Sequence, residues 1–258
     1  MIVLLRDRSG REHRLGVSHG SYIDADEASG PVHDLRHLVA LIGLADSHAH
    51  LSGNDVEDMT QYDGSGLADR MFANARRQME GGVLLLAEKG SKSSLTLQFL
   101  DVAEQRRPRM QMAGRMIAVN GGYYPGFAAE VDESDLVPAI DEAAQGGATW
   151  VKLVGDWPRK GRGVVPNFSE EALRQIVTSA HAAGCRVAVH TAGPDTPQMA
   201  VRAGVDSIEH GLFLSRQDLI ALGERGGAWV PTIFAMEAIA AWLGAASSGG
   251  RVLAAGLE

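Results

Sequence analysis

The feature that most constrains the fold is a regular alternation of short apolar runs with amphipathic helical segments. Seven runs rich in β-branched and aliphatic residues are typical of strands buried on both faces: 40–47, 82–88, 114–120, 149–155, 185–191, 205–211 and 228–234. Two of the intervening helices are expected to begin after Ser169 and Ser215 as N-caps and to stop at Gly184 and Gly226. Strands that alternate with helices in this way predict a parallel sheet.

Two architectures fit this pattern, a doubly wound open sheet and a (β/α)8 barrel. No G-x-G-x-x-G follows the first strand, which weakens the dinucleotide-binding form of the open sheet. The positions of the polar residues, described below, favour the barrel. We therefore predict an α/β protein with an incomplete (β/α)8 TIM-type barrel of about seven strand–helix units over 40–258. Residues 1–39 lack the rhythm and are expected to form a small β segment, part of a small β-sandwich.

Composition narrows the class of protein. The net charge is -8 with no basic stripe, so a nucleic-acid partner is not expected. No stretch approaches the roughly 20 consecutive apolar residues that are needed to cross a bilayer. The apolar run at the N-terminus is too short to be the core of a signal peptide. The lone Cys185 suits a reducing compartment. We expect a cytoplasmic protein that acts on a small molecule, without a membrane partner.

Polar side chains interrupt the buried strands near their carboxyl ends. His48 and His50 end the first strand, Lys152 lies in the fourth, and His190 and His210 close the fifth and sixth. In a parallel barrel these ends converge on one rim, where active sites form. Each residue alone has an ordinary structural explanation, since a single buried histidine is common. Their joint occurrence at strand ends is the reason to prefer a shared site.

Lys152 is the hardest of these residues to explain structurally. Its neighbours in the strand are apolar, and burying an unpaired ammonium costs several kcal/mol. The lysine must find an acidic partner, lose its charge or be chemically converted. Neutral imidazoles suit zinc and similar divalent ions. A lysine among them would be a ligand only as a carbamate.

With these motifs in place, the chain resembles the amidohydrolase superfamily of metal-dependent hydrolases. "GLADSHAHL" is similar to the first-strand signature of that family, and "TWVKLV", "VAVHTAG" and "DSIEHG" resemble its later ligand-bearing strands. "VRAGVDSIEHG" and "WVPTIFA" are closest to the subgroup of imidazolonepropionase-like and prolidase-type proteins. The resemblance implies one or two divalent ions per subunit, with zinc expected. It assigns His48 and His50 to the first ion, His190 and His210 to the second, and a carbamate on Lys152 to the bridge between them.

The resemblance also implies the chemistry, with Lys152, His190 and His210 as catalytic residues. A metal-bridging hydroxide would attack a carbonyl carbon and cleave an amide-type C–N bond in a dipeptide, an N-acyl amino acid or a cyclic amide. Deaminases of the same superfamily carry H-x-x-E after the fifth strand, where this chain has Gly193. Hydrolysis is therefore favoured over deamination. A lactonase or phosphotriesterase using the same metals remains a weaker alternative.

One departure from the family pattern is serious. The family places an aspartate at the end of the eighth strand, and the residues after 234 contain neither an Asp nor a strand candidate. Residues 40–258 are also short of the roughly 250 typical of a complete barrel. We expect the sequence to be truncated before the eighth strand, and the chain alone to be poorly stable or a homo-oligomer with little activity. A catalytically impaired metal-binding barrel is the second hypothesis.

Substrate contacts are expected in the loops that follow the strands. Tyr123 and Tyr124, in "NGGYYPGF", would either line a pocket or cover the barrel. Asn120 and Asp156 are further candidates for substrate binding. The cationic side chains of "GDWPRKGRG" (155–163) would either bind a substrate carboxylate or belong to a solvated loop that binds no ligand.

Overall fold

The structure is a computed structural model that describes residues 1–53, 65–244 and 247–257. The chain divides into two compact units, Met1–Leu44 and Ala45–Glu258. The first unit is a four-stranded sheet in the order β3-β2-β1-β4. Its strands are β1 (Ile2–Arg6), β2 (Glu12–Ser18), β3 (Ser21–Ile23) and β4 (Val32–Val39). These four strands all lie within the first unit.

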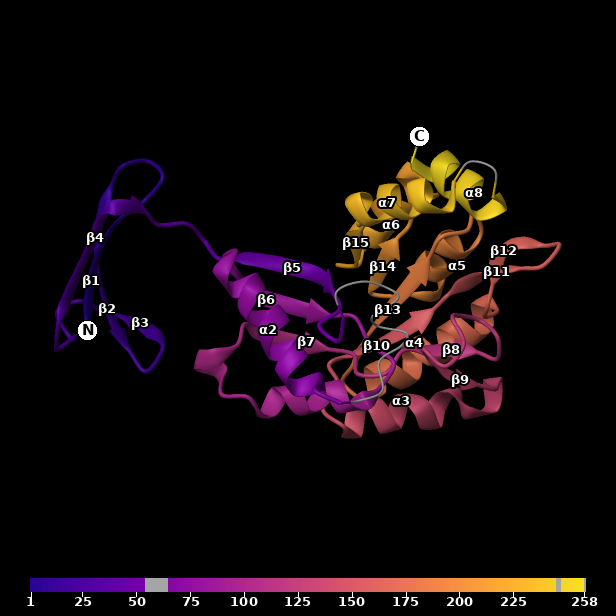
Figure 1. Ribbon diagram of the computed structural model, residues 1–258, viewed down its shortest axis with the longest axis horizontal. Helices are drawn as coiled ribbons and strands as arrows, with labels where there is room; N and C mark the ends of the chain where they lie inside the picture. Colours follow the sequence, from indigo (N-terminus) through magenta and orange to yellow (C-terminus); the bar gives the residue numbers. More distant parts are fainter. Residues whose placement is uncertain (54–64, 245–246, 258) are drawn as a thin grey trace. The chain divides into compact units, whose positions relative to one another are not determined.

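The second unit contains the parallel strands (Figure 1). A three-stranded sheet runs β5-β6-β7, and a six-stranded sheet runs β15-β14-β13-β10-β8-β9. Their bounds are β5 (Leu44–Ala49), β6 (Val83–Glu88), β7 (Arg109–Met112), β8 (Ile117–Val119), β9 (Ala129–Val131), β10 (Trp150–Val154), β13 (Arg186–Thr191), β14 (Ser207–His210) and β15 (Ala228–Val230). Within the described residues, no pairing closes these sheets into a barrel. The architecture is α/β with parallel strands.

Helices connect most of these strands, as the alternation predicts. They are α2 (Leu67–Glu80), α3 (Leu136–Gln145), α4 (Glu170–Ala182), α5 (Thr196–Ala203), α6 (Arg216–Glu224), α7 (Ile233–Leu243) and α8 (Ser248–Leu257), with short 3-10 turns at Ser94–Asp101, Glu104–Arg106 and Glu133–Asp135. Ser169 caps α4 through the backbone N–H of Ala172, and Ser215 forms a capping box with Asp218. Both predicted N-caps are confirmed. None of the described helices has the length and apolar character needed to cross a membrane.

The predicted third strand is shorter than expected. Residues 114–120 were expected to form one strand, but β8 covers only Ile117–Val119. A separate strand that was not predicted, β7, ends before it at Met112. Gly114 lies between the two strands with φ +71°, a conformation that does not continue an extended strand. The backbone N–H of Thr149, just before β10, nevertheless bonds the carbonyl of Met112 at 2.9 Å. Hydrogen bonding therefore continues from one sheet to the other.

An antiparallel hairpin was missed by the sequence analysis. β11 (Asp156–Arg159) and β12 (Gly163–Pro166) pair directly after β10, in the segment expected to be a solvated basic loop. Lys160 and Arg162 are exposed near its turn. Arg159 instead donates to the carbonyl of Gly121 and, at 3.1 Å, to Oδ1 of Asn167. The hairpin is thereby fastened to the loop after β8.

The core lies between the strands and the helices. On β10, Val151 and Leu153 pack toward α3 and α4, where they meet Leu173 and Ile176. A second cluster joins β5, β6 and β7 to α2. Because strand side chains alternate, Lys152 lies on the face of β10 opposite the helices. This alternation determines which polar residues can share a site.

Glu88, at the end of β6, is a fully buried acid. Its Oε2 accepts the backbone N–H of Gly90 at 3.2 Å, but its Oε1 has no hydrogen-bond partner in the described part of the chain. Burial raises the pKa of Glu88 to about 8. The protonated carboxyl is therefore the form that the folded protein favours.

This shift makes stability depend on pH. Between the ordinary glutamate pKa of 4.5 and about 8, the folded chain holds a proton that the unfolded chain has released. Stability should consequently fall as pH rises through that window. We expect the free energy of unfolding to fall by on the order of 3 kcal/mol more in wild type than in Glu88→Gln from pH 5 to 8. Urea denaturation of both proteins measures this.

Glu104→Gln, at an exposed site, controls for the loss of one negative charge. Parallel stability curves for wild type and Glu88→Gln would show that Glu88 is not held protonated in the folded chain.

Candidate metal centre

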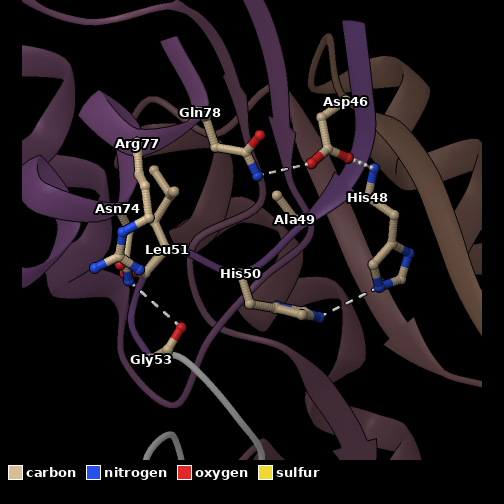
Figure 2. Close-up of a pocket in the computed structure, with 9 residues that line it drawn as sticks. All are labelled: Asp46, His48, Ala49, His50, Leu51, Gly53, Asn74, Arg77 and Gln78. Carbon is tan, nitrogen blue, oxygen red and sulfur yellow. Dashed lines mark hydrogen bonds between the residues drawn. The ribbon is translucent and has the colours of Figure 1, made fainter. Parts of the chain in front are cut away.

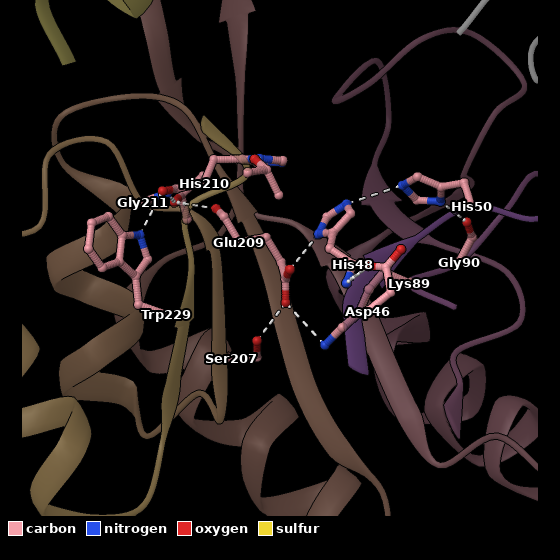
Figure 3. A network of polar contacts seen from close by, with 12 residues as sticks. Asp46, His48, His50, Lys89, Gly90, Ser207, Glu209, His210, Gly211 and Trp229 are labelled. Carbon is pink, nitrogen blue, oxygen red and sulfur yellow. Dashed lines mark hydrogen bonds and ion pairs between the residues drawn. The ribbon is translucent and has the colours of Figure 1, made fainter. Parts of the chain in front are cut away.

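Four histidines and one lysine from separate strands meet in the second unit. The ring centroid of His48 lies 5.1 Å from that of His50 and 5.2 Å from that of His210. The rings of His190 and His210 are 4.7 Å apart. The histidines come from β5, the turn after it, β13 and β14, and Lys152 comes from β10. Figure 3 shows His48, His50 and His210 in this arrangement.

His50 has a defined proton arrangement. Its Nδ1 lies 2.6 Å from the carbonyl oxygen of Gly90, which can only accept, so Nδ1 carries the proton. Burial lowers the pKa of His50 to about 3, and the ring is therefore neutral. The Nε2 of His50 must then hold a lone pair.

His48 is arranged in the same way. Its Nδ1 donates to Oε2 of Glu209, and burial lowers the pKa of the ring. Its Nε2 faces Nε2 of His50 at 3.3 Å. Two lone pairs that face each other repel unless a proton or a cation lies between them. The donor chemistry of this pair therefore fits a divalent metal ion.

Glu209 on β14 contacts His48 on β5 and Lys89, which directly follows β6 (Figure 3). Its side chain is fully buried. Oε1 accepts from the Ser207 hydroxyl at 2.6 Å and lies 3.1 Å from Nζ of Lys89, while Oε2 accepts from His48. Burial alone would raise the pKa of Glu209, but the His48 hydrogen bond and the charges of Lys152 and Lys89 bring it well below its usual value. Glu209 is therefore a buried carboxylate.

Lys89 completes this network. Only 2% of its surface is exposed, and its Nζ lies 3.6 Å from the ring centre of Trp150. The ammonium thus has a carboxylate on one side and an aromatic face on the other, two environments that offset the cost of burying a cation.

Lys152 lies in the same interior and is 2% exposed. A Cβ added to Gly90 would lie 3.4 Å from its Cβ and Cγ, so the chain passes close against the lysine stem. Burial lowers the pKa of Lys152 to about 8. The amine is therefore still mainly protonated at pH 7, but its neutral fraction is much larger than that of an exposed lysine.

His210 is held by contacts on both sides. Its backbone carbonyl accepts from Nε1 of Trp229 at 2.7 Å, and its Nδ1 lies 2.6 Å from Oγ1 of Thr232. Burial lowers the pKa of His210 well below its ordinary value and that of His190 to about 3. Both rings are neutral, as ligation requires.

Asp156 and Asn120 are both occupied by protein partners. The buried carboxylate of Asp156 accepts the backbone N–H groups of Ala192 at 2.9 Å and Gly193 at 3.1 Å, which follow His190. Burial raises the pKa of Asp156 to about 6. Asn120 donates to Oδ1 of Asp132 at 2.7 Å. Their use as substrate ligands stays a prediction, and the contacts of Asp156 are those of a residue that fixes the loop after β13.

Aromatic side chains gather beside His190. The ring of Trp157 lies 4.6 Å from that of Tyr123 and 4.8 Å from that of Tyr124, and Tyr123 lies 5.9 Å from His190. Trp157 is on the hairpin and the tyrosines are on the loop after β8, so two connections of the fold build this cluster.

A cavity of about 440 Å³ opens beside β5. Figure 2 shows its lining residues, which are Asp46, His48, Ala49, His50, Leu51, Gly53, Asn74, Arg77 and Gln78. Asp46 accepts the backbone N–H of His48 at 3.0 Å and Nε2 of Gln78 at 3.1 Å. The two histidines are thus reachable from a polar cavity.

The position of the deaminase glutamate is closed. A Cβ on Gly193 would lie 2.8 Å from Cγ1 of Val164 on the hairpin, which is closer than real Cβ contacts. A side chain here would force the hairpin to move.

No three His, Cys, Asp or Glu side chains in the described residues form a ready-made cage around one ion. What fits a metal is the pair of facing lone pairs, with His190 and His210 next to it. The remaining histidines lie elsewhere: His181 is on an exposed face of α4 and bonds Asp206, and His13, His19, His33 and His37 are in the first unit.

Comparison with known proteins places this site in context. The sequence profile of the amidohydrolase family matches residues 39–241. An uncharacterized protein of Mycobacterium tuberculosis is 37% identical over 199 residues, which are 76% of this chain and 51% of that protein. The chain thus spans about half the length of the curated relatives it matches.

Solved structures share the fold. A prolidase complexed with N-methylphosphonate-L-proline is 21% identical with a TM-score of 0.79, and the match covers 100% of this chain and 73% of that one. A Xaa-Pro dipeptidase with bound methionine is also 21% identical, with a TM-score of 0.74 and the same coverage. The matched profile, which spans residues 39–241, identifies the chain as a member of the amidohydrolase family.

Proposed function

We propose that this protein is a metal-dependent hydrolase that cleaves an amide-type C–N bond in a dipeptide, an N-acyl amino acid or a cyclic amide. The observation that carries the proposal is the pair of Nε2 lone pairs on His48 and His50, which face each other because both Nδ1 atoms are engaged. Two further neutral imidazoles and a buried amine lie beside them. Family membership supports hydrolysis as the reaction class.

We also propose that the parallel strands belong to a (β/α)8 barrel. Support comes from the prolidase-type structures, which match over the whole chain. In such a barrel, the strand ends that carry the histidines would form the active-site rim.

The roles of the residues follow from their chemistry. His48 and His50 would hold a first ion through Nε2, and His190 and His210 a second. A divalent ion, with zinc expected, supplies an activated water and polarises a carbonyl oxygen when bound. Glu209 keeps the His48 proton on Nδ1, and Gly90 does the same for His50, so neither ring can rotate without breaking a buried hydrogen bond.

Lys152 would bridge the ions as a carbamate. The ammonium first loses one proton, and the neutral amine then forms a C–N bond to carbon dioxide and releases a second proton. The loss of two protons in all would convert a buried cation into an anion with two ligand oxygens. The lowered pKa favours this reaction because only the neutral amine is a nucleophile. The carbamate would also remove the electrostatic repulsion between a buried ammonium and a metal cation bound by the neighbouring histidines.

The aromatic cluster indicates where an apolar part of the substrate would bind. Tyr123 and Trp157 lie next to His190, and Tyr124 contacts both of them, which places apolar surface beside the proposed metal ligand. Proline-containing dipeptides are therefore part of the screen, as are N-acyl amino acids with aromatic acyl groups.

The direct test is zinc binding followed by turnover. We expect wild type, loaded with zinc in bicarbonate buffer, to hold one or two ions per chain and to hydrolyse at least one member of a panel of Xaa-Pro dipeptides, N-acyl amino acids and lactones. His48→Asn with His50→Asn should lose at least one ion, measured by elemental analysis. The exposed His181→Asn is the matched control and should keep both metal and activity.

Equal zinc content in wild type and the double variant would contradict the proposal. Turnover of lactones alone would replace amide hydrolysis with the lactonase alternative, and bound zinc without any turnover would favour an impaired barrel.

Glu209→Gln tests the second layer of the site. The glutamine amide lacks the negative charge that pairs with the ammonium of Lys89. A buried ion left without its partner lowers the free energy of unfolding by about 3–5 kcal/mol. It also loses the carboxylate that orients His48, which should weaken zinc binding about 10- to 100-fold. Denaturation and zinc competition with a chelator measure the two effects.

A double variant separates these effects. Lys89→Met in the Glu209→Gln background removes the unpaired cation, so most of the stability should return while zinc affinity stays low. Recovery of both together would mean that Glu209 acts through stability alone.

A further inference from the structure

Two strained residues touch each other at the edge of the metal centre. Among the described residues, three that are not glycine have a positive φ, and two of them are His210 at 66° and Thr232 at 46°. Nδ1 of His210 and Oγ1 of Thr232 lie 2.6 Å apart. Left-handed backbone at such residues persists only when the surroundings impose it, and it gathers at functional sites.

The strain at His210 has a geometric consequence. Ser207 and Glu209 lie on the same face of β14, toward Lys89, while Ile208 packs into the helical layer. A regular strand would send His210 to the side of Ile208. The left-handed turn instead brings the ring of His210 to His48 and His190.

The turn is held from outside. Nε1 of Trp229 donates to the carbonyl of His210, and Gly211 leaves the room for this contact. A Cβ on Gly211 would lie 2.8 Å from that indole nitrogen, and Gly211 itself has φ +57°. The backbone of His210 is therefore fixed, but these contacts do not determine which ring nitrogen carries the proton.

Thr232 is an unsuitable residue for its own backbone. It precedes α7 in a left-handed conformation, which β-branched residues rarely adopt and which Gly or Asn accepts more readily. No backbone requirement explains a threonine here. What threonine adds is a hydroxyl within hydrogen-bond distance of Nδ1 of His210.

We propose that Thr232 is a positioning residue that accepts the Nδ1 proton of His210 and so directs its Nε2 lone pair toward His48 and His190. The strain at Thr232 is then the cost of placing a hydroxyl at this point. The assignment rests on the proposed metal-dependent function, because the lone pair matters as a ligand.

Three substitutions separate the hydroxyl from the strain. Thr232→Val keeps the shape and the β-branch but removes the hydroxyl, and it should lower zinc affinity at least about 10-fold. Thr232→Ser keeps the hydroxyl and should bind zinc within about 3-fold of wild type, well inside the 10-fold loss typical of such partners. Thr232→Asn relieves the backbone and should raise Tm by about 2–4 °C while it still weakens zinc binding.

The ring proton is measured directly, without metal. Nitrogen-15 NMR of histidine-labelled, zinc-free protein should show His210 protonated at Nδ1 in wild type and in Thr232→Ser. In Thr232→Val a mixture of the two tautomers is expected. His19→Asn, at the third strained position and in the first unit, is the matched control and should change neither zinc affinity nor this spectrum.

The outcomes distinguish this inference from the proposed function. If wild type binds no zinc but shows the Nδ1-protonated ring that Thr232→Val loses, the function fails and the positioning role stands. An Nε2-protonated His210 in wild type, or equal zinc affinity in Thr232→Val and wild type, overturns the positioning role.

Discussion

The arrangement of the site depends on one buried carboxylate. Glu209 on β14 reaches His48 on β5, 161 residues away, and Lys89 just after β6. These strands lie in two different sheets, so the contact joins the two halves of the second unit. It also fixes the proton of His48 on Nδ1. One side chain therefore connects the assembly of the unit to the chemistry of its ligands.

Around this carboxylate, burial gives the imidazoles a common property. His48, His50, His190 and His210 all have lowered pKa values, chiefly because burial penalises the charged ring. His48 and His50, whose Nδ1 atoms are engaged, turn their Nε2 lone pairs toward each other. The same burial lowers the pKa of Lys152, which favours the neutral amine that the proposed carbamate requires. The interior is thus suited to receive cations, and strain at His210 turns one further ring into it.

Much of this was predictable from local pattern. Apolar runs and N-cap serines located the parallel strands and two helix starts, and the position of histidines at strand ends brought distant residues together. The sequence was less informative where tertiary contacts decide. The third strand is shorter than predicted and is preceded by the unpredicted β7, and the hairpin after β10 has a basic turn that resembles a loop in sequence. Asp156, expected at the substrate, is bound to backbone groups after His190.

Glu209 was overlooked although it directly precedes His210. A charged residue within an apolar strand indicates a buried polar site, and this was the argument made for Lys152. The same argument applies to Glu209 and to the adjacent pair Glu88 and Lys89. Their partners, however, are set by which strands face each other across the interior, which local spacing does not specify. Thr232 carried no signal, since a left-handed threonine is visible only in the backbone. The cytoplasmic location and the oligomeric state stay predictions.

Anomalous X-ray diffraction from crystals grown with zinc tests the central claim most directly. The account predicts a zinc peak between the Nε2 atoms of His48 and His50, with Nδ1 of His48 still bonded to Glu209. Zinc found only at surface histidines, or a His48 ring turned away from both His50 and Glu209, would contradict it.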